Sequence, residues 1–100
     1  MEHRVSFSPE ARGDLLDLFD HIAADAGARR AFAYTARIEQ ACLGLAEFPH
    51  RGAPRDDIRA GLRVLALWRR VRIAYTVSTG EVTIVRILYG GRQRPLDDEE

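Results

Sequence analysis

The segment Val82-Thr83-Ile84-Val85-Arg86-Ile87-Leu88-Tyr89-Gly90-Gly91-Arg92 carries the strongest structural signal in the chain. Apart from Arg86, its first eight residues are β-branched, leucine or aromatic, the composition of a strand covered on both faces. Burying an arginine is costly, whereas an arginine exposed among apolar neighbours suggests a functional surface. The direction in which Arg86 points therefore decides whether both faces of this strand are buried or one face belongs to a functional surface.

Residues 70–77 alternate polar and apolar side chains and predict the strand that pairs with this segment. A three-residue loop at 78–80 would pair Arg72 with Arg86, outside the core. A two-residue loop would instead place Arg86 opposite Ile73 in the core, because a slip of one residue exchanges the faces of a strand. We favour the three-residue loop because it buries no charge, although it sets two like charges side by side. Its core face would consist of Val71, Ile73, Tyr75, Val85 and Ile87.

The N-terminal half predicts one strand and two helices. Residues 3–7 alternate polar and apolar side chains, as a strand does, and Ser8 and Pro9 then supply a helix cap and a first-turn proline. Amphipathic patterns over residues 9–25 and 28–47 predict an antiparallel αα-hairpin with an apolar face that needs a second layer.

The second half predicts an antiparallel sheet. Residues 50–61 are rich in Pro, Gly, Asp and Arg and predict an irregular loop, and residues 62–67 predict a further strand. The expected fold class is therefore α+β, with an N-terminal strand, an αα-hairpin and then a three-stranded antiparallel meander. We expect one domain over residues 1–94, followed by a disordered, solvating acidic tail at 95–100, with folding back on the arginine-rich face as the alternative.

Length and composition indicate a small globular protein. The chain has 100 residues, 46% of them hydrophobic and 30% charged, which is ordinary for one domain. We expect a cytoplasmic protein, because no apolar run is long enough to span a membrane and the first residues lack the apolar region of a signal peptide. The single cysteine, Cys42, is expected to be a small core residue.

The net charge of zero conceals an asymmetry. Residues 1–50 carry five arginines and eight acidic residues, residues 51–94 carry ten arginines and three acidic residues, and residues 95–100 carry four acidic residues. All 15 Lys or Arg positions are arginine, so the chain offers many permanently charged guanidinium groups but no lysine amine that burial converts into a general base. Guanidinium clusters suit carboxylates and phosphates.

Four short blocks stand in a fixed order along the chain: Phe7-Ser8-Pro9-Glu10-Ala11 with Asp14-Leu15; Leu45-Ala46-Glu47-Phe48-Pro49 with Gly52; Pro54-Arg55-Asp56-Asp57-Ile58-Arg59 with Gly61-Leu62-Arg63; and Ile84-Val85-Arg86-Ile87-Leu88 with Gly90 and Arg92. In these blocks and their order the chain resembles the ParE/RelE superfamily of bacterial type II toxins, and its ParE-like branch in particular. The chain departs from the family pattern at Tyr89, where members typically carry histidine, and in the run that follows it.

The resemblance implies a toxin that inhibits DNA gyrase by binding and is neutralised by a cognate ParD-like antitoxin in a hetero-oligomer. RelE-like relatives instead cleave messenger RNA on the ribosome, which requires groups that accept and donate protons. This chain has no lysine, and its three histidines are not grouped in the sequence. We therefore expect a non-enzymatic toxin with no cofactor, no metal and no direct binding to nucleic acid. An endoribonuclease is the alternative, and a member that only sequesters its antitoxin is a third possibility.

Three sets of candidate residues follow. The target-binding set is Arg70, Arg72, Arg86, Tyr89 and Arg92, with Arg70, Arg72 and Arg86 expected on one sheet face. If the protein is a ribonuclease, the catalytic set is Arg86, Tyr89 and Arg92. The antitoxin-binding set is Leu16, Phe32, Tyr34, Leu43, Arg63 and Trp68. Tyr89 is also expected to pack at the end of its strand rather than to donate a proton.

Overall fold

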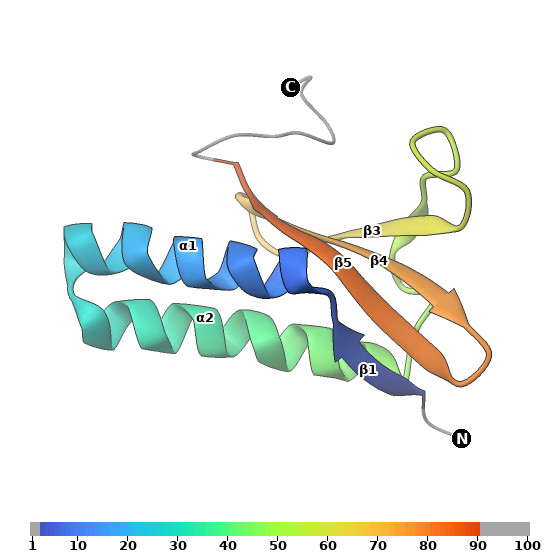
Figure 1. Cartoon of the computed structure of the whole chain (residues 1–100), viewed down its shortest axis with the longest axis horizontal. Coiled ribbons are helices and arrows are strands. Elements are labelled where there is room, and N and C mark those ends of the chain that lie inside the picture. The colour runs from blue at the N-terminus through green and yellow to red at the C-terminus, as the bar shows by residue number, and fades with distance from the viewer. Residues whose placement is uncertain (1–2, 91–100) are drawn as a thin grey trace.

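A computed structural model describes residues 3–90 and shows a helical hairpin packed on a twisted sheet (Figure 1). The elements are, in chain order, β1 (Arg4–Phe7), α1 (Pro9–Ala26), α2 (Ala28–Leu43), the short 3₁₀ helix η1 (Gly44–Ala46), β2 (Ala53–Pro54), β3 (Leu62–Ala66), β4 (Val71–Ser78) and β5 (Glu81–Tyr89). The predicted α+β class and the antiparallel β3–β4–β5 meander are confirmed. Within residues 3–90, no helix is both long and apolar enough to cross a membrane.

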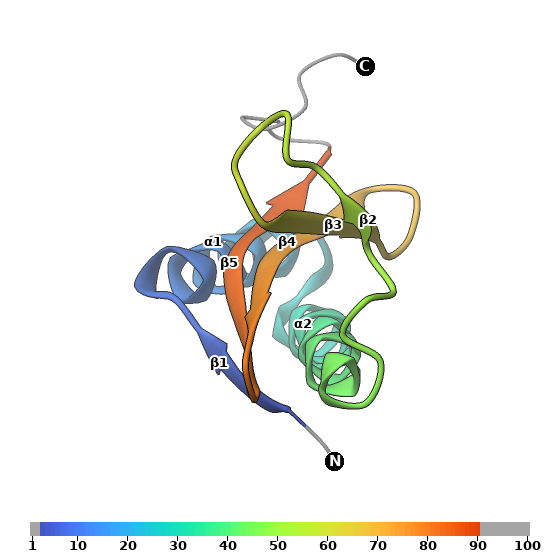
Figure 2. The same cartoon turned by 90° about the vertical axis from the view of Figure 1, so that its right-hand side faces the viewer.

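The sheet has the strand order β1-β5-β4-β3-β2, so the first strand pairs with the last. β1 runs parallel to β5, with Arg4 opposite Glu81 and Phe7 opposite Ile84. A parallel neighbour requires a long crossover connection, and the helical hairpin with the following strands supplies it. α1 consequently lies beside β1 and β5, while the connection between β2 and β3 lies away from α2 (Figure 2).

Local sequence sets the helix ends. The Ser8 hydroxyl accepts a hydrogen bond from the Ala11 amide (3.0 Å), and Pro9 occupies the first turn of α1. Gly27, with a φ of 95°, separates the two helices because that backbone conformation is unfavourable for other residues. α2 ends at Leu43 rather than at the expected residue 47, and the last turn tightens into η1.

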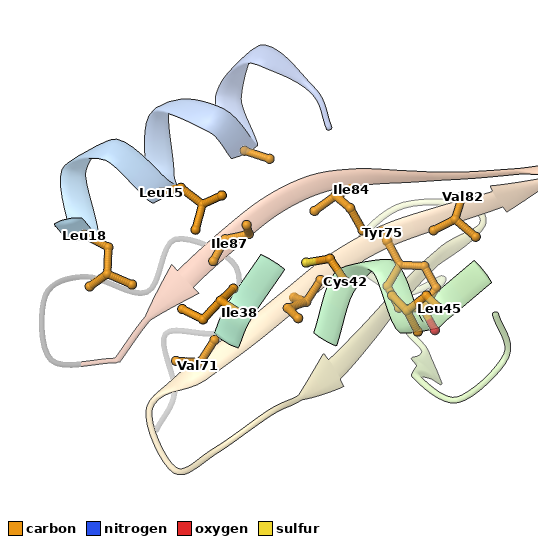
Figure 3. Close-up of a cluster of buried hydrophobic side chains, with 12 residues drawn as sticks. Leu15, Leu18, Ile38, Cys42, Leu45, Val71, Tyr75, Val82, Ile84 and Ile87 are labelled. Carbon is orange, nitrogen blue, oxygen red and sulfur yellow. The ribbon is translucent and has the colours of Figure 1, made fainter. Parts of the chain in front are cut away.

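The core lies between the helical hairpin and the β4–β5 pair (Figure 3). Its buried side chains come from α1, α2, η1 and the strands: Ala11, Leu15, Leu18, Ile38, Cys42, Leu45, Val71, Ile73, Tyr75, Val82, Ile84 and Ile87. Ile87 occupies the core position opposite Ile73 that the three-residue loop would have given to Val85, and Val85 is only partly buried.

The β4–β5 hairpin corrects the predicted register. Ser78 pairs with Glu81, so the loop has two residues, and Gly80 has a φ of 73°. A two-residue loop without irregularity would have carried Arg86 into the core opposite Ile73. The pairing instead shifts by one residue between Ala74 and Tyr75, which makes Val85 an extra residue in β5. The bulge restores the core face, because Ile73 then pairs with Ile87.

Arg72 is consequently opposite Leu88, and Arg86 is opposite Ala74. The predicted direct pairing of Arg72 with Arg86 is wrong, and with it the unfavourable contact between like charges. The registers still leave the two arginines on the same face of the sheet, at diagonal positions.

The Tyr75 side chain anchors the loop after η1 to the sheet. The buried hydroxyl of Tyr75 donates a hydrogen bond to the Pro49 carbonyl (2.8 Å) and accepts one from the Gly52 amide (2.8 Å). Arg63 donates to the Gly52 carbonyl at 2.6 Å. A Cβ atom at Gly52 would lie 2.7 Å from the Tyr75 hydroxyl and 3.0 Å from the Val64 backbone, so only glycine fits without displacement.

We expect Gly52→Ala to lower the free energy of unfolding by about 1–3 kcal/mol, because the added methyl group forces apart the Tyr75 anchor. Urea denaturation followed by circular dichroism measures the change. Gly13→Ala is the matched control: a Cβ there meets nothing within 4 Å, and replacing a helical glycine stabilises by roughly 0.5–1 kcal/mol. Equal effects at the two glycines would contradict this account.

Cys42 is fully buried in the core, as predicted. Burial raises the pKa of its thiol to about 12, with a smaller contribution from the negative charge of Glu39. At pH 8 only roughly one thiol in ten thousand is then ionised, and the thiolate is the reactive form. We expect alkylation by iodoacetamide at pH 8 to be negligible in the folded protein and rapid in urea, as measured by mass spectrometry. Rapid modification of the folded chain would show that Cys42 is accessible.

Candidate functional site

The outer edge of β5 is completed by side chains from α1. β1 covers β5 only as far as Ile84, which leaves the following backbone groups of β5 without a strand partner. The Ser8 amide donates to the Ile84 carbonyl (2.9 Å), and the Ser8 hydroxyl donates to the carbonyl of the bulged residue Val85 (2.8 Å). Six residues further along the chain, on α1, the Asp14 carboxylate accepts a hydrogen bond from the Ile87 amide (2.8 Å). The helix thus continues the hydrogen bonding that β1 begins.

Arg86 pairs with the same carboxylate. Its guanidinium donates two hydrogen bonds to Asp14, at 2.8 and 2.9 Å, in the bidentate geometry that gives charged pairs their strength. The Arg86 and Asp14 side chains are 33% and 15% exposed, so the pair is partly shielded from water. The hydrogen bonds that Arg86 donates to Asp14 raise the pKa of Arg86, and they outweigh the opposite effect of its partial burial. Arg86 is therefore neither buried in the core nor presented openly to solvent.

Arg70, Arg72 and Arg86, the described arginines that the sequence predicts to bind a target, do not gather at one place. Arg86 is engaged with α1, while Arg72 borders a hollow on the sheet face away from the helices. Arg70 lies in the β3–β4 connection, with its guanidinium 5.9 Å from the centre of the Tyr89 ring. The expectation that these three arginines line one sheet face is wrong for Arg70, and Arg86 turns from that face toward the β5 edge. Their role in binding a target stays a prediction.

Tyr89 packs at the end of β5, as expected. Its ring centre lies 5.8 Å from that of His21 and 6.3 Å from that of Tyr34, the latter in an edge-on arrangement. Tyr89 thus contacts α1 at His21, seven residues beyond the Asp14 that holds Arg86. Seven residues span about 10 Å along a helix, so the ribonuclease candidates Arg86 and Tyr89 contact α1 at two separate positions.

Tyr89 belongs to a larger group of side chains, some of which the sequence analysis assigned to the target-binding set and others to the antitoxin-binding set. Tyr34 also packs against Trp68 with ring centres 5.1 Å apart, and the Arg37 guanidinium lies 4.6 Å above the Trp68 ring. We call His21, Tyr34, Arg37, Trp68, Arg70 and Tyr89 the aromatic cluster. Burial, followed by the nearby Tyr89 hydroxyl, raises the pKa of Tyr34 above its ordinary value.

The cluster joins two predicted target-binding residues, Arg70 and Tyr89, with two predicted antitoxin-binding residues, Tyr34 and Trp68. His21 and Arg37 were missed because their contacts cross from the helices to the sheet, which no sequence spacing reveals. Shallow space beside Trp68 is lined by Ala36, Arg37 and Gln40.

Known proteins are similar to this chain in both sequence and fold. Residues 5–94 match the family described as ParE toxin of type II toxin-antitoxin system, parDE. This chain is a member of the ParE toxin family. It is 33% identical over 87 residues to Toxin ParE3 of Caulobacter vibrioides, a match that covers 87% of this chain and 86% of that toxin.

Two solved structures resemble this ParE family member. The chromosomal ParDE toxin–antitoxin system of P. aeruginosa matches with a TM-score of 0.77 and 25% identity, over 88% of this chain and 96% of that one. The toxin–antitoxin complex RelBE2 of Mycobacterium tuberculosis matches with a TM-score of 0.68 and 25% identity, over 89% and 92% of the two chains. The predicted RelE/ParE-like fold is confirmed.

The remaining candidates of this ParE family member have separate positions. Leu16 on α1 and Phe32 on α2 are both 67% exposed, and Leu43 at the end of α2 is 46% exposed. Phe48, which sequence reasoning did not select, is also exposed. Arg63 holds the loop at Gly52 and so has a structural contact of its own.

Arg92 and the acidic residues 95–100 lie outside the described residues. Within residues 3–90, no three side chains of His, Cys, Asp or Glu are grouped so that they could hold a metal ion.

We expect Asp14→Ala to lower the free energy of unfolding by about 1–3 kcal/mol, because it leaves the Ile87 amide and the Arg86 guanidinium without their acceptor. Arg86→Ala should cost less, about 1 kcal/mol, since Asp14 still accepts from Ile87 and the lost pair is partly screened by water. Urea denaturation measures both. Asp17→Ala, at an exposed position of α1, is the control, and a loss there equal to that of Asp14→Ala would contradict the edge-capping role.

Proposed function

We propose that this protein is a toxin that inhibits DNA gyrase by binding to it, and that a ParD-like antitoxin neutralises it in a stable complex. The observation that carries the proposal is the match to the ParE toxin family across residues 5–94. Two structurally similar proteins are a ParDE system and a toxin–antitoxin complex, which supports an antitoxin as partner.

The separation of Arg86 from Tyr89 supports binding over RNA cleavage. Arg86 is held by Asp14, and Tyr89 packs among His21, Tyr34 and Arg70. Cleavage by proton transfer requires an acid and a base within hydrogen-bonding reach of the same phosphate. Tyr89 in this setting acts as a packing and contact surface.

The aromatic cluster is the surface through which we expect the target to be bound. Arg70 and Arg37 are exposed, while Trp68 and Tyr89 are half-buried and held by ring contacts. Aromatic and arginine side chains that are held in place are the residue types enriched at the centres of protein interfaces. Because Tyr34 and Trp68 are also antitoxin candidates, an antitoxin that covers them would cover Arg70 and Tyr89 as well. Neutralisation then follows from steric exclusion of the target.

We expect the purified protein to reduce ATP-dependent supercoiling of relaxed plasmid by gyrase, and a stoichiometric amount of its antitoxin to restore it. Agarose gel electrophoresis of the plasmid measures both. Arg70→Ala should raise the half-inhibitory concentration on the order of 10-fold, the effect of losing one interface hot spot.

Arg69→Ala is the matched control, since Arg69 is also exposed and is the neighbour of Arg70 in the same connection. Normal supercoiling in the presence of the folded protein, combined with cleavage of transcripts in cells, would move the function to ribonuclease. A folded protein that affects neither process would indicate a member that only sequesters antitoxin.

A further inference from the structure

A hollow of about 200 Å³ lies on the face of the sheet away from the helical hairpin. Ala53, Arg55, Ile58, Val64, Ala66, Arg72 and Leu88 line it. The strand registers explain its shape: Ala53, Val64 and Ala74 form one cross-strand row, and Ala66, Arg72 and Leu88 form the next. The small alanine side chains leave space in both rows, and the connection between β2 and β3 forms a wall at Arg55 and Ile58. The floor is therefore apolar.

The charge at the rim of the hollow is positive. Arg72 is exposed and borders it from β4, and Arg55 borders it from the β2–β3 connection. Arg55 donates two hydrogen bonds to Asp57, both at 3.0 Å, and this pair is open to water. An exposed ion pair contributes little and exchanges readily for another carboxylate. An apolar floor between two guanidinium groups suits a short segment with one apolar side chain followed by carboxylates.

The chain itself contains such a segment just beyond the described residues. The sequence Pro95-Leu96-Asp97-Asp98-Glu99-Glu100 places one leucine directly before four acidic residues. Leu88, which lines the hollow, lies two residues before Gly90, where the described chain ends. The six residues from Gly90 to Leu96 span up to about 20 Å, which is sufficient to return to the hollow.

We propose that the hollow is a docking site for the chain's own acidic C-terminal segment, with Leu96 on the apolar floor and the carboxylates at Arg55 and Arg72. A tethered ligand acts at an effective concentration of the order of millimolar, so even a weak contact is largely formed. The docked segment screens the arginine-bordered face against acidic segments of other proteins. This inference does not depend on gyrase being the target.

A fluorescently labelled peptide of residues 94–100 tests the proposal in trans. Two full-length chains are compared by fluorescence anisotropy: the unmodified chain, and a chain whose tail is neutralised by Leu96→Asn, Asp97→Asn, Asp98→Asn, Glu99→Gln and Glu100→Gln. We expect the peptide to bind the neutral-tail chain on the order of 10-fold more tightly, because the unmodified tail competes for the same site. Equal affinity for the two chains, or binding to neither, overturns the proposal.

Two substitutions in the neutral-tail chain locate the site. Arg72→Gln should weaken peptide binding several-fold, whereas Arg59→Gln, at an exposed arginine of the β2–β3 connection that does not line the hollow, should leave it unchanged. Equal losses of affinity in the two variants would show that the peptide is held by general charge attraction, and would overturn the hollow as its binding site. In the unmodified chain, nuclear Overhauser effects between the Leu96 and Leu88 or Val64 methyl groups are the direct signature of docking. If these effects are absent and Leu96 has random-coil chemical shifts, the segment is not docked and the proposal is overturned.

Discussion

The outer edge of β5 is the constraint on which the arrangement of this fold depends. A strand flanked by a partner over only part of its length leaves backbone amides and carbonyls that need other acceptors and donors. Ser8 and Asp14 supply them, because the chain passes from β1 into α1 without leaving that edge. The first two turns of α1 are thereby fixed against β5. The apolar side chains Leu15 and Leu18 follow into the core from the same helix.

The bulge at Val85 solves a conflict between loop geometry and burial. The two-residue loop alone would direct Arg86 into the core, where an unpaired guanidinium is costly. One extra residue in β5 exchanges the faces beyond it, so Ile87 enters the core and Arg86 leaves it. The same bulge presents the Val85 carbonyl to Ser8 and brings Arg86 to Asp14. Arg86, which the sequence analysis selected as a target-binding residue, thus has a partner within the fold, Asp14.

The two faces of the sheet are suited to different contacts. On the helix side, the aromatic cluster joins residues from α1, α2, the β3–β4 connection and β5, so one partner that covers it affects all of them. On the other side, the hollow between Arg55 and Arg72 is small, apolar at its floor and basic at its rim. A large aromatic surface suits a folded protein, whereas a small basic hollow suits a short acidic segment.

The sequence by itself determined the helices, the meander, the core residue Cys42 and the family, because capping residues, hydrophobic periodicity and short family blocks are local signals. It also identified Tyr89 as a packing residue. Only the tertiary structure decided the parallel pairing of β1 with β5, the bulge at Val85 and the Asp14–Arg86 pair. Each of these joins parts of the chain on different elements, or depends on one residue of register, and a side-chain period of two cannot distinguish a bulge from a longer loop. The same reason explains why the sequence did not place the target and antitoxin candidates in one aromatic cluster. That cluster is formed by packing between the helices and the sheet, which is not a local signal.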